Sequence, residues 1–401
     1  MRNLKSISID TKNKVAWVQG GSLLGEVYYK IANISRNLAF PAGLCPTVGV
    51  GGHISGGGIG TLVRKYGIAA DNIIDARIMN VKGDILDRKS MGEDLFWAIR
   101  GGGVASFGVL LEWKFNLVDV PSIVSAFRVN RTLEQNATKI VHKWQEILPK
   151  FGKDLFIRVS ITRLEYENGK RTVQVTFESL YLGGVGKLFK KIEEIFPELG
   201  LKREDCSEMS WIDSALYFSM LPSGATLDDL VSTPTYPKSY YKAKSDLVTK
   251  PIPEFALEGL WKKFFVDEAK EAQLIFHPYG GRMDEIKDDE IPFPHRKGNL
   301  FEIQHLVYWD EKDNKKSMKF INWIRNLYDY MTPYVSKSPR AAYFNYRDLD
   351  LGVNNEKRSS YAQASIWGIR YFKGNFFKLA QVKTKVDPEN FFRSEQSIPT
   401  L

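Results

Sequence analysis

The stretch "LCPTVGVGGHISGGGIG", residues 44–60, is the most unusual part of this 401-residue sequence. Glycine is dense between positions 49 and 60, and glycine loses more conformational freedom on folding than any other residue. Such a run indicates either a structural turn or a backbone that approaches a ligand closely. Successive N–H groups in the run can converge on an anion such as pyrophosphate. The spacing matches neither the dinucleotide-binding nor the phosphate-binding glycine motif, so the residues alone leave both alternatives open.

Cys45 stands near the start of this stretch and is one of only two cysteines in the chain. An isolated cysteine is usually a small buried apolar residue. At the edge of a ligand-binding loop, however, its thiolate can attack a bound cofactor. Cys206 is the only disulfide partner available within the chain. His53 is expected by default to be a hydrogen-bonded structural histidine.

The residues around the glycine run predict one domain over residues 1–118. Apolar residues at strand or helix spacing, with glycine and polar stops, set the element boundaries. The predicted elements are a hairpin over 5–18, a helix over 23–35, a short helix over 61–66 ended by Gly67, a hairpin over 75–87 that turns at Lys82-Gly83, a helix up to Gly101 with capping-box spacing from Ser90 to Glu93, and a buried strand over 107–121.

Residues 119–350 show a different pattern of apolar and polar residues. Alternating runs such as 156–167 and 171–183 are followed by amphipathic runs such as 185–199. This pattern predicts an antiparallel sheet with helices on one side, which is an α+β arrangement. Residues 351–401 form a C-terminal segment, with one amphipathic helix and then a turn at "DPENFF".

The composition is that of a globular protein with a mildly basic surface. Hydrophobic residues make up 43% of the chain, and the net charge of +9 is scattered rather than gathered in long runs. This pattern argues against nucleic-acid binding, and the lack of an apolar run of about eighteen residues argues against a membrane span. The five histidines show no metal-ligand spacing. Residues 1–18 lack the apolar core of a signal peptide, yet Asn33, Asn130 and Asn136 begin glycosylation sequons.

Polar residues that could form a site follow in "FEIQHLVYW" (301–309) and "AYFNYRDLDLG" (342–352). On a strand, Glu302 and Gln304 share one face and point into a common site. By the same rule Asn345 and Arg347 share a face, opposite Phe344 and Tyr346. The alternatives are that Glu302 is a surface charge and that Tyr346 is a half-buried aromatic residue.

Six motifs together resemble the plant berberine-bridge-enzyme-like FAD-linked oxidases of the vanillyl-alcohol-oxidase superfamily. They are "CPTVGVGGHISGGG", "RKYGIAADN", "GEDLFWAIRGGG", "PYGGRMDEI", "NYRDLDLG" and "VDPENFFRSEQSIP". The resemblance implies part of a PCMH-type FAD-binding domain over 1–118, a substrate domain over 119–350, and a berberine-like segment over 351–401 that returns to the FAD domain. It also implies a secreted plant glycoprotein that oxidises alcohol groups of a carbohydrate or of an aromatic or alkaloid metabolite, with O₂ as electron acceptor.

The resemblance also implies site residues. Cys45 matches the cysteine that bonds covalently to C6 of the flavin, and Asn345 matches a flavin-contacting asparagine. Tyr346 matches a tyrosine that is the active-site base in some members, Glu302 falls where others keep a catalytic glutamate, and Gln304 matches a polar active-site position. The other positions that match the loop around the cofactor are Thr47, Val48, Gly49, Gly51, Gly52, His53, Ser55, Gly56 and Gly57.

The implied chemistry places one condition on Tyr346. A base removes the proton of the substrate hydroxyl while a hydride passes to flavin N5, and a base needs a pKa near the working pH. Tyrosine titrates near 10, so a cationic neighbour is expected to stabilise its phenolate. Val48 is small, and by family analogy it leaves O₂ access to the flavin, as in an oxidase.

The sequence departs from the family in two respects. The resemblance starts at about residue 3, after the FAD-binding half whose "SGGH" histidine makes the family's second covalent flavin bond, so that half and the histidine link are expected to be absent. Ile59 stands where several relatives place an active-site tyrosine. The alternative to an active oxidase is therefore a catalytically silent fragment or binding paralogue, or an incomplete gene model.

Overall fold

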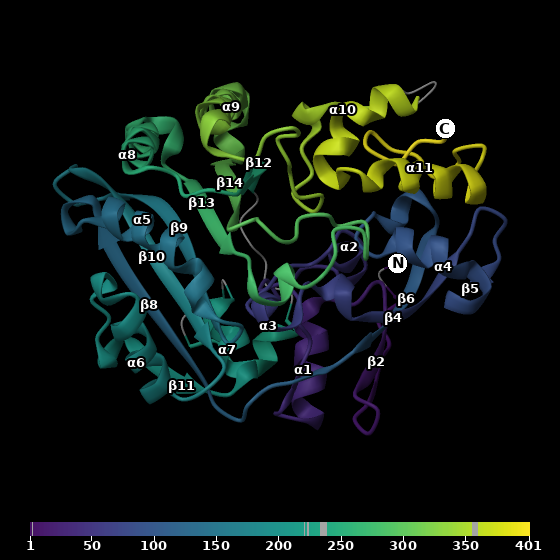
Figure 1. The fold of residues 1–401 in the computed structure, drawn as a ribbon, viewed down its shortest axis with the longest axis horizontal. Coiled ribbons are helices and arrows are strands. Elements are labelled where there is room, and N and C mark those ends of the chain that lie inside the picture. Colours follow the sequence, from purple (N-terminus) through teal and green to yellow (C-terminus); the bar gives the residue numbers. More distant parts are fainter. Residues whose placement is uncertain (2, 220, 223, 233–238, 355–359) are drawn as a thin grey trace.

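The computed structural model describes residues 1, 3–219, 221–222, 224–232, 239–354 and 360–401, and two antiparallel sheets organise it (Figure 1). The N-terminal sheet has the strand order β1-β2-β6-β4-β5, and each neighbouring pair is antiparallel. Its strands are β1 (Ile7–Asp10), β2 (Val15–Gln19), β6 (Val109–Asn116), β4 (Ile73–Met79) and β5 (Ile85–Leu86). The accompanying helices are α1 (Leu24–Ile34), α2 (Val50–Ser55), α3 (Val63–Tyr66) and α4 (Arg88–Ile99).

Most of the elements expected in this half are confirmed. The two predicted hairpins are β1–β2 and β4–β5, and α1 and α3 lie where helices were expected. Gly67 ends α3 with a φ of +76°, a conformation that glycine adopts without steric cost. The predicted strand over 107–121 is divided into β6 and the short β7 (Val118–Asp119), which pairs with β3 (Leu38–Ala39).

The cap of α4 differs from the prediction. Asp87, rather than Ser90, is the N-cap: its carboxylate accepts a hydrogen bond from the Ser90 backbone N–H at 2.8 Å. The Ser90 hydroxyl in turn accepts a bond from the Asp87 N–H at 2.9 Å. Glu93, the expected partner of Ser90, forms an ion pair with Arg88 instead. The capping box therefore lies three residues earlier than the sequence spacing suggested.

The larger sheet has seven strands in the order β11-β8-β10-β9-β13-β14-β12, with antiparallel neighbours throughout. The strands are β8 (Val124–Thr132), β9 (Leu155–Glu165), β10 (Arg171–Tyr181), β11 (Cys206–Met209), β12 (Ser239–Val248), β13 (Ala272–Pro278) and β14 (Phe301–Asp310). Their apolar faces share one core with α5 (Ala137–Ile147), α6 (Val185–Ile195), α8 (Glu254–Lys262) and α9 (Ser317–Met331). The predicted antiparallel sheet with helices on one side is thus confirmed, while α7 (Trp211–Phe218) packs in the N-terminal core.

The described part of the C-terminal segment contains two helices where one was predicted. α10 (Tyr361–Phe372) and α11 (Asn375–Val386) are separated at Lys373, whose φ of +46° cannot continue a right-handed helix. Both helices pack in the N-terminal core, and α11 lies against α4 (Figure 1). The segment therefore returns to the first half of the chain, as the resemblance implied. None of the helices in the described ranges has the length and apolar content needed to cross a membrane.

Candidate functional site

The glycine stretch is fastened to the start of α1. The N–H groups of Leu24 and Gly25 donate to the carbonyl oxygens of Val48 and Pro46 at 2.9 Å, and Val50 donates back to Ser22. Cys45 lies in the turn before this contact, partly buried. Its Sγ is 3.5 Å from Thr47 Oγ1, and it has no disulfide partner. Cys206 is also a free thiol, so the disulfide open to the sequence is not formed.

The glycines of the stretch divide into two groups. A Cβ on Gly56 would lie 2.0 Å from Asn345 Oδ1, and one on Gly51 would lie 2.7 Å from Gly20 O. Gly57 also faces protein atoms, with a φ of +129°. Gly49 and Gly52, by contrast, are exposed, and a Cβ on either would meet open space. The packing alternative therefore applies to Gly51, Gly56 and Gly57, while the backbone at Gly49 and Gly52 is exposed, so ligand binding there stays a prediction.

This division makes a prediction. Gly56→Ala is expected to lower the melting temperature, because its methyl group displaces the Asn345 amide. Gly52→Ala is expected to leave the melting temperature unchanged and to weaken binding of added FAD. Thermal melts and flavin titrations of the two variants check this. An unchanged melting temperature in Gly56→Ala, or a lowered one in Gly52→Ala, would contradict the division.

His53 is bound within the chain. Its Nε2 accepts a hydrogen bond from the Gly43 N–H at 2.9 Å. Burial lowers its pKa to about 4, so the imidazole is neutral near pH 7. This arrangement is the structural role expected by default. Ser55, at the end of α2, likewise donates from its hydroxyl to Gly52 O at 2.9 Å.

A second segment, residues 343–346, is hydrogen-bonded to the glycine stretch. The Asn345 amide donates to His53 O at 2.9 Å and to the Tyr343 hydroxyl at 2.8 Å. The same hydroxyl accepts a bond from the Gly58 N–H at 2.8 Å. Tyr343, which the sequence interpretation missed, therefore joins Asn345 in linking the two segments. It stands two residues before Asn345 in the quoted motif, but nothing in the motif separates its role from that of Tyr346.

The strand predicted around Asn345 is wrong. Residues 344–346 form a turn, in which the Tyr346 N–H donates to Tyr343 O at 3.0 Å. Two-residue alternation therefore does not apply. Arg347 is exposed, and its guanidinium lies 4.9 Å from the centre of the Phe344 ring.

Glu302 is fully buried on β14, which excludes the surface-charge alternative. Its Oε2 accepts a hydrogen bond from the Tyr279 hydroxyl at 2.8 Å, and its Oε1 has no partner. Burial raises the pKa of Glu302 to about 8, although the bond from Tyr279 opposes this. Gln304 shares the strand face of Glu302 and is partly buried, so this part of the strand prediction is confirmed.

Tyr346 lies near Glu302 and is partly buried, with its ring centre 5.0 Å from that of Tyr343. Burial, and then the charge of Glu302, raise the pKa of Tyr346 well above 10. Arg158 is the expected cationic neighbour and acts in the opposite direction, but its guanidinium is already paired with Glu178 at 2.6 Å. The expectation of a stabilised phenolate is therefore wrong for this arrangement. The raised pKa keeps the Tyr346 hydroxyl protonated near neutral pH, whereas the pKa of Glu302 is about 8.

Further residues of the site were missed because they depend on strand register. His277 on β13 stands directly opposite Glu302 on β14. It is buried, and burial lowers its pKa to about 3. Tyr279 comes directly after the end of β13, and Arg158 comes from β9. Tyr279 lies in the quoted "PYGGRMDEI" motif, which was the one available signal.

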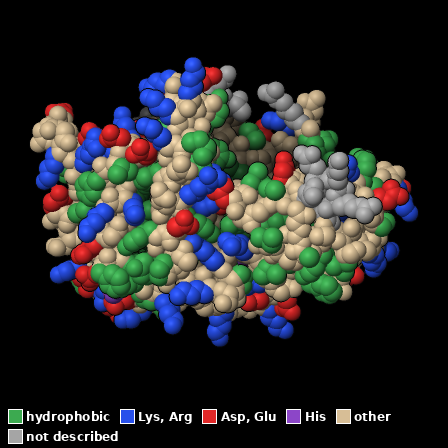
Figure 2. Space-filling view, turned by 90° about the horizontal axis from the view of Figure 1, so that it is seen from above, with side chains coloured by type: hydrophobic (Ala, Val, Ile, Leu, Met, Phe, Trp, Pro, Cys, Tyr) green, Lys and Arg blue, Asp and Glu red, His purple; other side chains and the backbone are tan. Residues whose placement is uncertain are grey.

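The residues present fit a flavin. The free thiol of Cys45 belongs to the same stretch as the exposed backbone of Gly49 and Gly52, and the unpartnered Oε1 of Glu302 belongs to the adjoining cluster. Within the described ranges, no group of three or more His, Cys, Asp or Glu side chains is placed to hold a metal ion. Seen from above, the surface is hollowed near the middle, and basic and acidic side chains are interspersed over this face (Figure 2).

Comparison with known proteins agrees with this fit. The family profile "FAD binding domain" matches residues 1–88, and "Berberine and berberine like" matches residues 342–399. The chain is 54% identical to tetrahydroberberine oxidase from Berberis wilsoniae, over 99% of this chain and 75% of that protein. It is 52% identical to berberine bridge enzyme-like 22 from Arabidopsis thaliana, over 100% and 75%.

The solved structure of BBE-like 28 from Arabidopsis thaliana superposes with a TM-score of 0.96, at 49% identity over 100% of this chain and 82% of that one. Such identity over nearly the whole chain shows common family membership. The chain belongs to the berberine-bridge-enzyme-like family of FAD-linked oxidoreductases.

Proposed function

We propose that this chain oxidises an alcohol group of a carbohydrate or of a plant aromatic or alkaloid metabolite. The observation that carries the proposal is the buried Glu302 carboxyl, with one free oxygen and a pKa raised to about 8. A general base is most effective when its pKa lies near the working pH. Bound FAD would supply the hydride acceptor and would pass both electrons to O₂, which leaves as hydrogen peroxide.

Each residue of the cluster has a proposed task. Oε1 of Glu302 takes the hydroxyl proton, so the substrate loses a proton and a hydride and leaves as a carbonyl compound. Tyr279 occupies Oε2 and thereby leaves Oε1 for the substrate. Tyr346 remains protonated and donates a hydrogen bond to the substrate oxygen. Gln304, on the same strand face as Glu302, offers an amide for a second substrate hydroxyl.

Cofactor binding is assigned to the glycine stretch. Cys45 is the proposed covalent attachment point, supported by its free thiol in the stretch that also holds the open backbone of Gly49 and Gly52. Thr47 and Val48 are the other proposed flavin contacts before Gly49. Asn345, in the segment 343–346, supports the glycine stretch through its bond to His53 O. Val48 is the proposed gate for O₂, which favours an oxidase over a dehydrogenase.

Secretion is also proposed, in keeping with the family resemblance. Asn33, Asn130 and Asn136, which begin the three sequons, are all exposed and accessible to a glycosyltransferase. A fall in apparent mass after glycosidase treatment of the plant-expressed protein would support the proposal. An unchanged mass would contradict the glycosylation.

The names of related proteins suggest a panel of test substrates, namely glucose, coniferyl alcohol and tetrahydroberberine. One relative is a monolignol oxidoreductase from Arabidopsis thaliana, and one solved relative is a glucose dehydrogenase. We expect the FAD-loaded protein, mixed anaerobically with glucose or with coniferyl alcohol, to lose its visible flavin absorption with one of them. Admitting O₂ should restore the absorption and yield one peroxide per carbonyl formed. Bleaching by tetrahydroberberine and by neither alcohol would contradict the alcohol assignment.

A further inference from the structure

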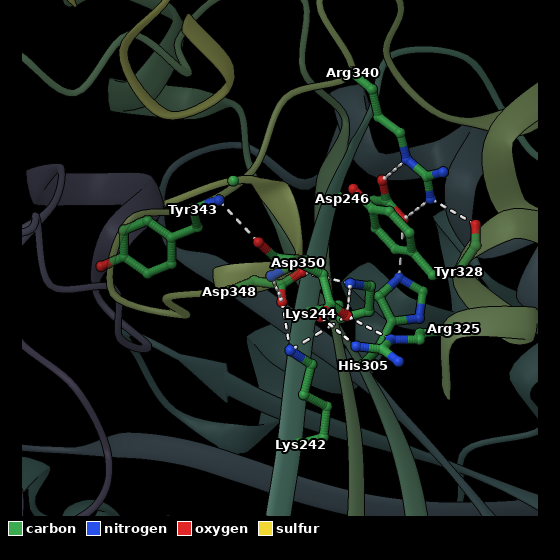
Figure 3. Close-up of polar contacts among 12 residues, drawn as sticks. Lys242, Lys244, Asp246, His305, Arg325, Tyr328, Arg340, Tyr343, Asp348 and Asp350 are labelled. Atoms are coloured by element: carbon green, nitrogen blue, oxygen red, sulfur yellow. Dashed lines mark hydrogen bonds and ion pairs between the residues drawn. The ribbon is translucent and has the colours of Figure 1, made fainter. Parts of the chain in front are cut away.

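A cluster of charged residues from β12 and the elements around it lies outside the proposed active site (Figure 3). β12 is one of the two edge strands of the seven-stranded sheet. We call this group the β12 ion cluster: Lys242, Lys244, Asp246, His305, Arg325, Arg340, Asp348 and Asp350. None of its members was singled out by the sequence interpretation, and the proposed chemistry uses none of them.

The first half of the cluster holds the chain at Arg340. The Arg340 guanidinium donates to the two carboxylate oxygens of Asp246 at 2.7 and 2.8 Å. It also lies 3.3 Å from the centre of the Tyr328 ring on α9 and donates to Tyr328 O. His305 Nε2 is 3.0 Å from the same carboxylate. Asp246 and His305 are completely buried, so this anchor is shielded from solvent.

The second half holds the chain at Asp348 and Asp350. Asp348, itself buried, accepts hydrogen bonds from Lys242 at 2.6 Å and from Lys244 at 2.5 Å. Asp350 accepts from Lys244 at 2.9 Å and from Arg325 on α9 at 2.7 and 3.0 Å. The Arg325 and lysine contacts hold the pKa of Asp350 far below its usual range, so the carboxylate is ionised at any working pH.

The segment between these anchors carries the proposed site residues. Residues 341–347 run from Arg340 to Asp348 and include Tyr343, Asn345 and Tyr346. The Tyr343 N–H donates to the hydroxyl of Ser245 at 2.8 Å. Because side chains alternate along a strand, Ser245 points to the opposite face of β12 from Lys244 and Asp246. The segment is therefore anchored at both ends on one face of β12 and presents its middle on the other.

A structural role alone does not explain so many buried charges. A buried ion pair is weak evidence for stability, since apolar residues of similar volume often serve as well. A buried ion pair does specify which two residues meet, because removing one member leaves the other charge buried and unpaired. In the β12 ion cluster, these specific pairs fix the positions of Arg340 and Asp348, the residues on either side of the 341–347 segment.

We propose that Lys244 and Asp348 are positioning residues that hold the 341–347 segment against the glycine stretch and Glu302. This inference rests on the proposed function, in which Asn345 supports the flavin-binding stretch at His53 and Tyr346 donates a hydrogen bond to the substrate. A small displacement of such groups lowers the rate of the chemical step more than it lowers substrate binding. The β12 ion cluster is thus predicted to influence kcat through contacts made on the far side of a strand.

The test compares Lys244→Met with Lys383→Met in FAD-loaded protein. Lys383 is a matched control, because it is also completely buried and is paired with Asp387 at 2.5 Å, but in α11. Hydrogen exchange of peptides covering 341–347 is expected to accelerate at least about tenfold in Lys244→Met. In Lys383→Met, exchange is expected to accelerate only near α11 and the C-terminus. Unchanged exchange of the 341–347 peptides in Lys244→Met would overturn the inference.

Kinetics distinguish positioning from simple stabilisation. In Lys244→Met, the limiting rate of anaerobic flavin reduction is expected to fall about tenfold or more, with less than about a twofold change in the half-saturating alcohol concentration. Lys244→Arg keeps the charge and should restore most of the rate. A normal rate in Lys244→Met despite faster exchange would reduce the cluster to a structural role.

A milder variant keeps the inference testable if Lys244→Met does not fold. Lys242 is less buried than Lys244, with 19% of its side chain exposed, and Lys242→Met should show the same pattern with smaller effects. Unchanged exchange and rate in Lys242→Met would then overturn the inference. The exchange measurement needs no substrate. Failure of the wild type to oxidise any panel compound would therefore refute the proposed function without deciding whether the cluster holds the segment.

Discussion

Glu302→Gln is expected to lower the rate of anaerobic flavin reduction by about 10²- to 10⁴-fold, the usual contribution of a general base. Glutamine keeps the shape of the side chain and the bond to Tyr279, but it cannot take a proton. The starting group is well suited to the task, because it is fully buried, has one free oxygen and has a pKa of about 8. Stopped-flow absorbance with the best alcohol of the panel measures the effect.

Thermal stability provides the control for Glu302→Gln. The pKa of Glu302 is raised in the folded state, so the folded protein binds the proton more tightly than the unfolded chain does. Stability from this group is therefore complete below the unfolded pKa near 4.5 and is lost as pH rises towards 8. Glu302→Gln should be more stable than the wild type by a few kcal/mol at pH 9 and nearly equal to it at pH 5. A slow but destabilised variant at pH 9 would point to disruption of the fold rather than to loss of a base.

Cys45→Ala is expected to abolish covalent flavin. The Cys45 thiol is partly buried, unpaired and part of the stretch that leaves the backbone of Gly49 and Gly52 bare. A thioether to the flavin ring removes one hydrogen from sulfur and one from the ring, and O₂ takes up the two electrons. After acid precipitation, flavin should remain with wild-type protein and appear in the supernatant of Cys45→Ala. The mass of the Cys45 peptide, increased by one FAD less two hydrogens, identifies the attachment point.

Cys206→Ala is the matched control for this experiment. Burial raises the pKa of the Cys206 thiol to about 11, which keeps it protonated and unreactive near neutral pH. This variant should retain as much covalent flavin as the wild type. Flavin that stays with acid-precipitated Cys45→Ala would contradict the assignment, as would a Cys45–Cys206 disulfide in the native protein.

The sequence was most informative where one strand or one motif determines the outcome. Two-residue alternation placed Glu302 and Gln304 on one face of β14, and the helical spacing of residues 23–35 gave α1. Alternation failed at Asn345 because residues 344–346 form a turn held by Tyr343 and Ser245. That turn depends on a strand about a hundred residues earlier in the chain. Local spacing carries no information about such a contact.

The chemistry of the site was less predictable than its location. The family resemblance offered Tyr346 as an active-site base and Glu302 as a catalytic glutamate. Burial favours Glu302 as the base, because it raises the pKa of Glu302 to about 8 and raises that of Tyr346 well above 10. Register also matters, because it places His277 opposite Glu302. The glycine stretch shows the same limit of prediction from sequence. Gly56 is packed against Asn345 and Gly52 faces open space, and the sequence alone does not distinguish the two.

The pH dependence of flavin reduction tests the central claim that Glu302 is the base of an FAD-linked oxidation. The carboxylate is the active form, so the wild-type rate should rise with pH through one ionisation near 8. In Glu302→Gln the remaining slow rate should show no ionisation in this range. If Glu302→Gln keeps both the rate and the pH profile of the wild type, another group takes the proton and the claim is wrong.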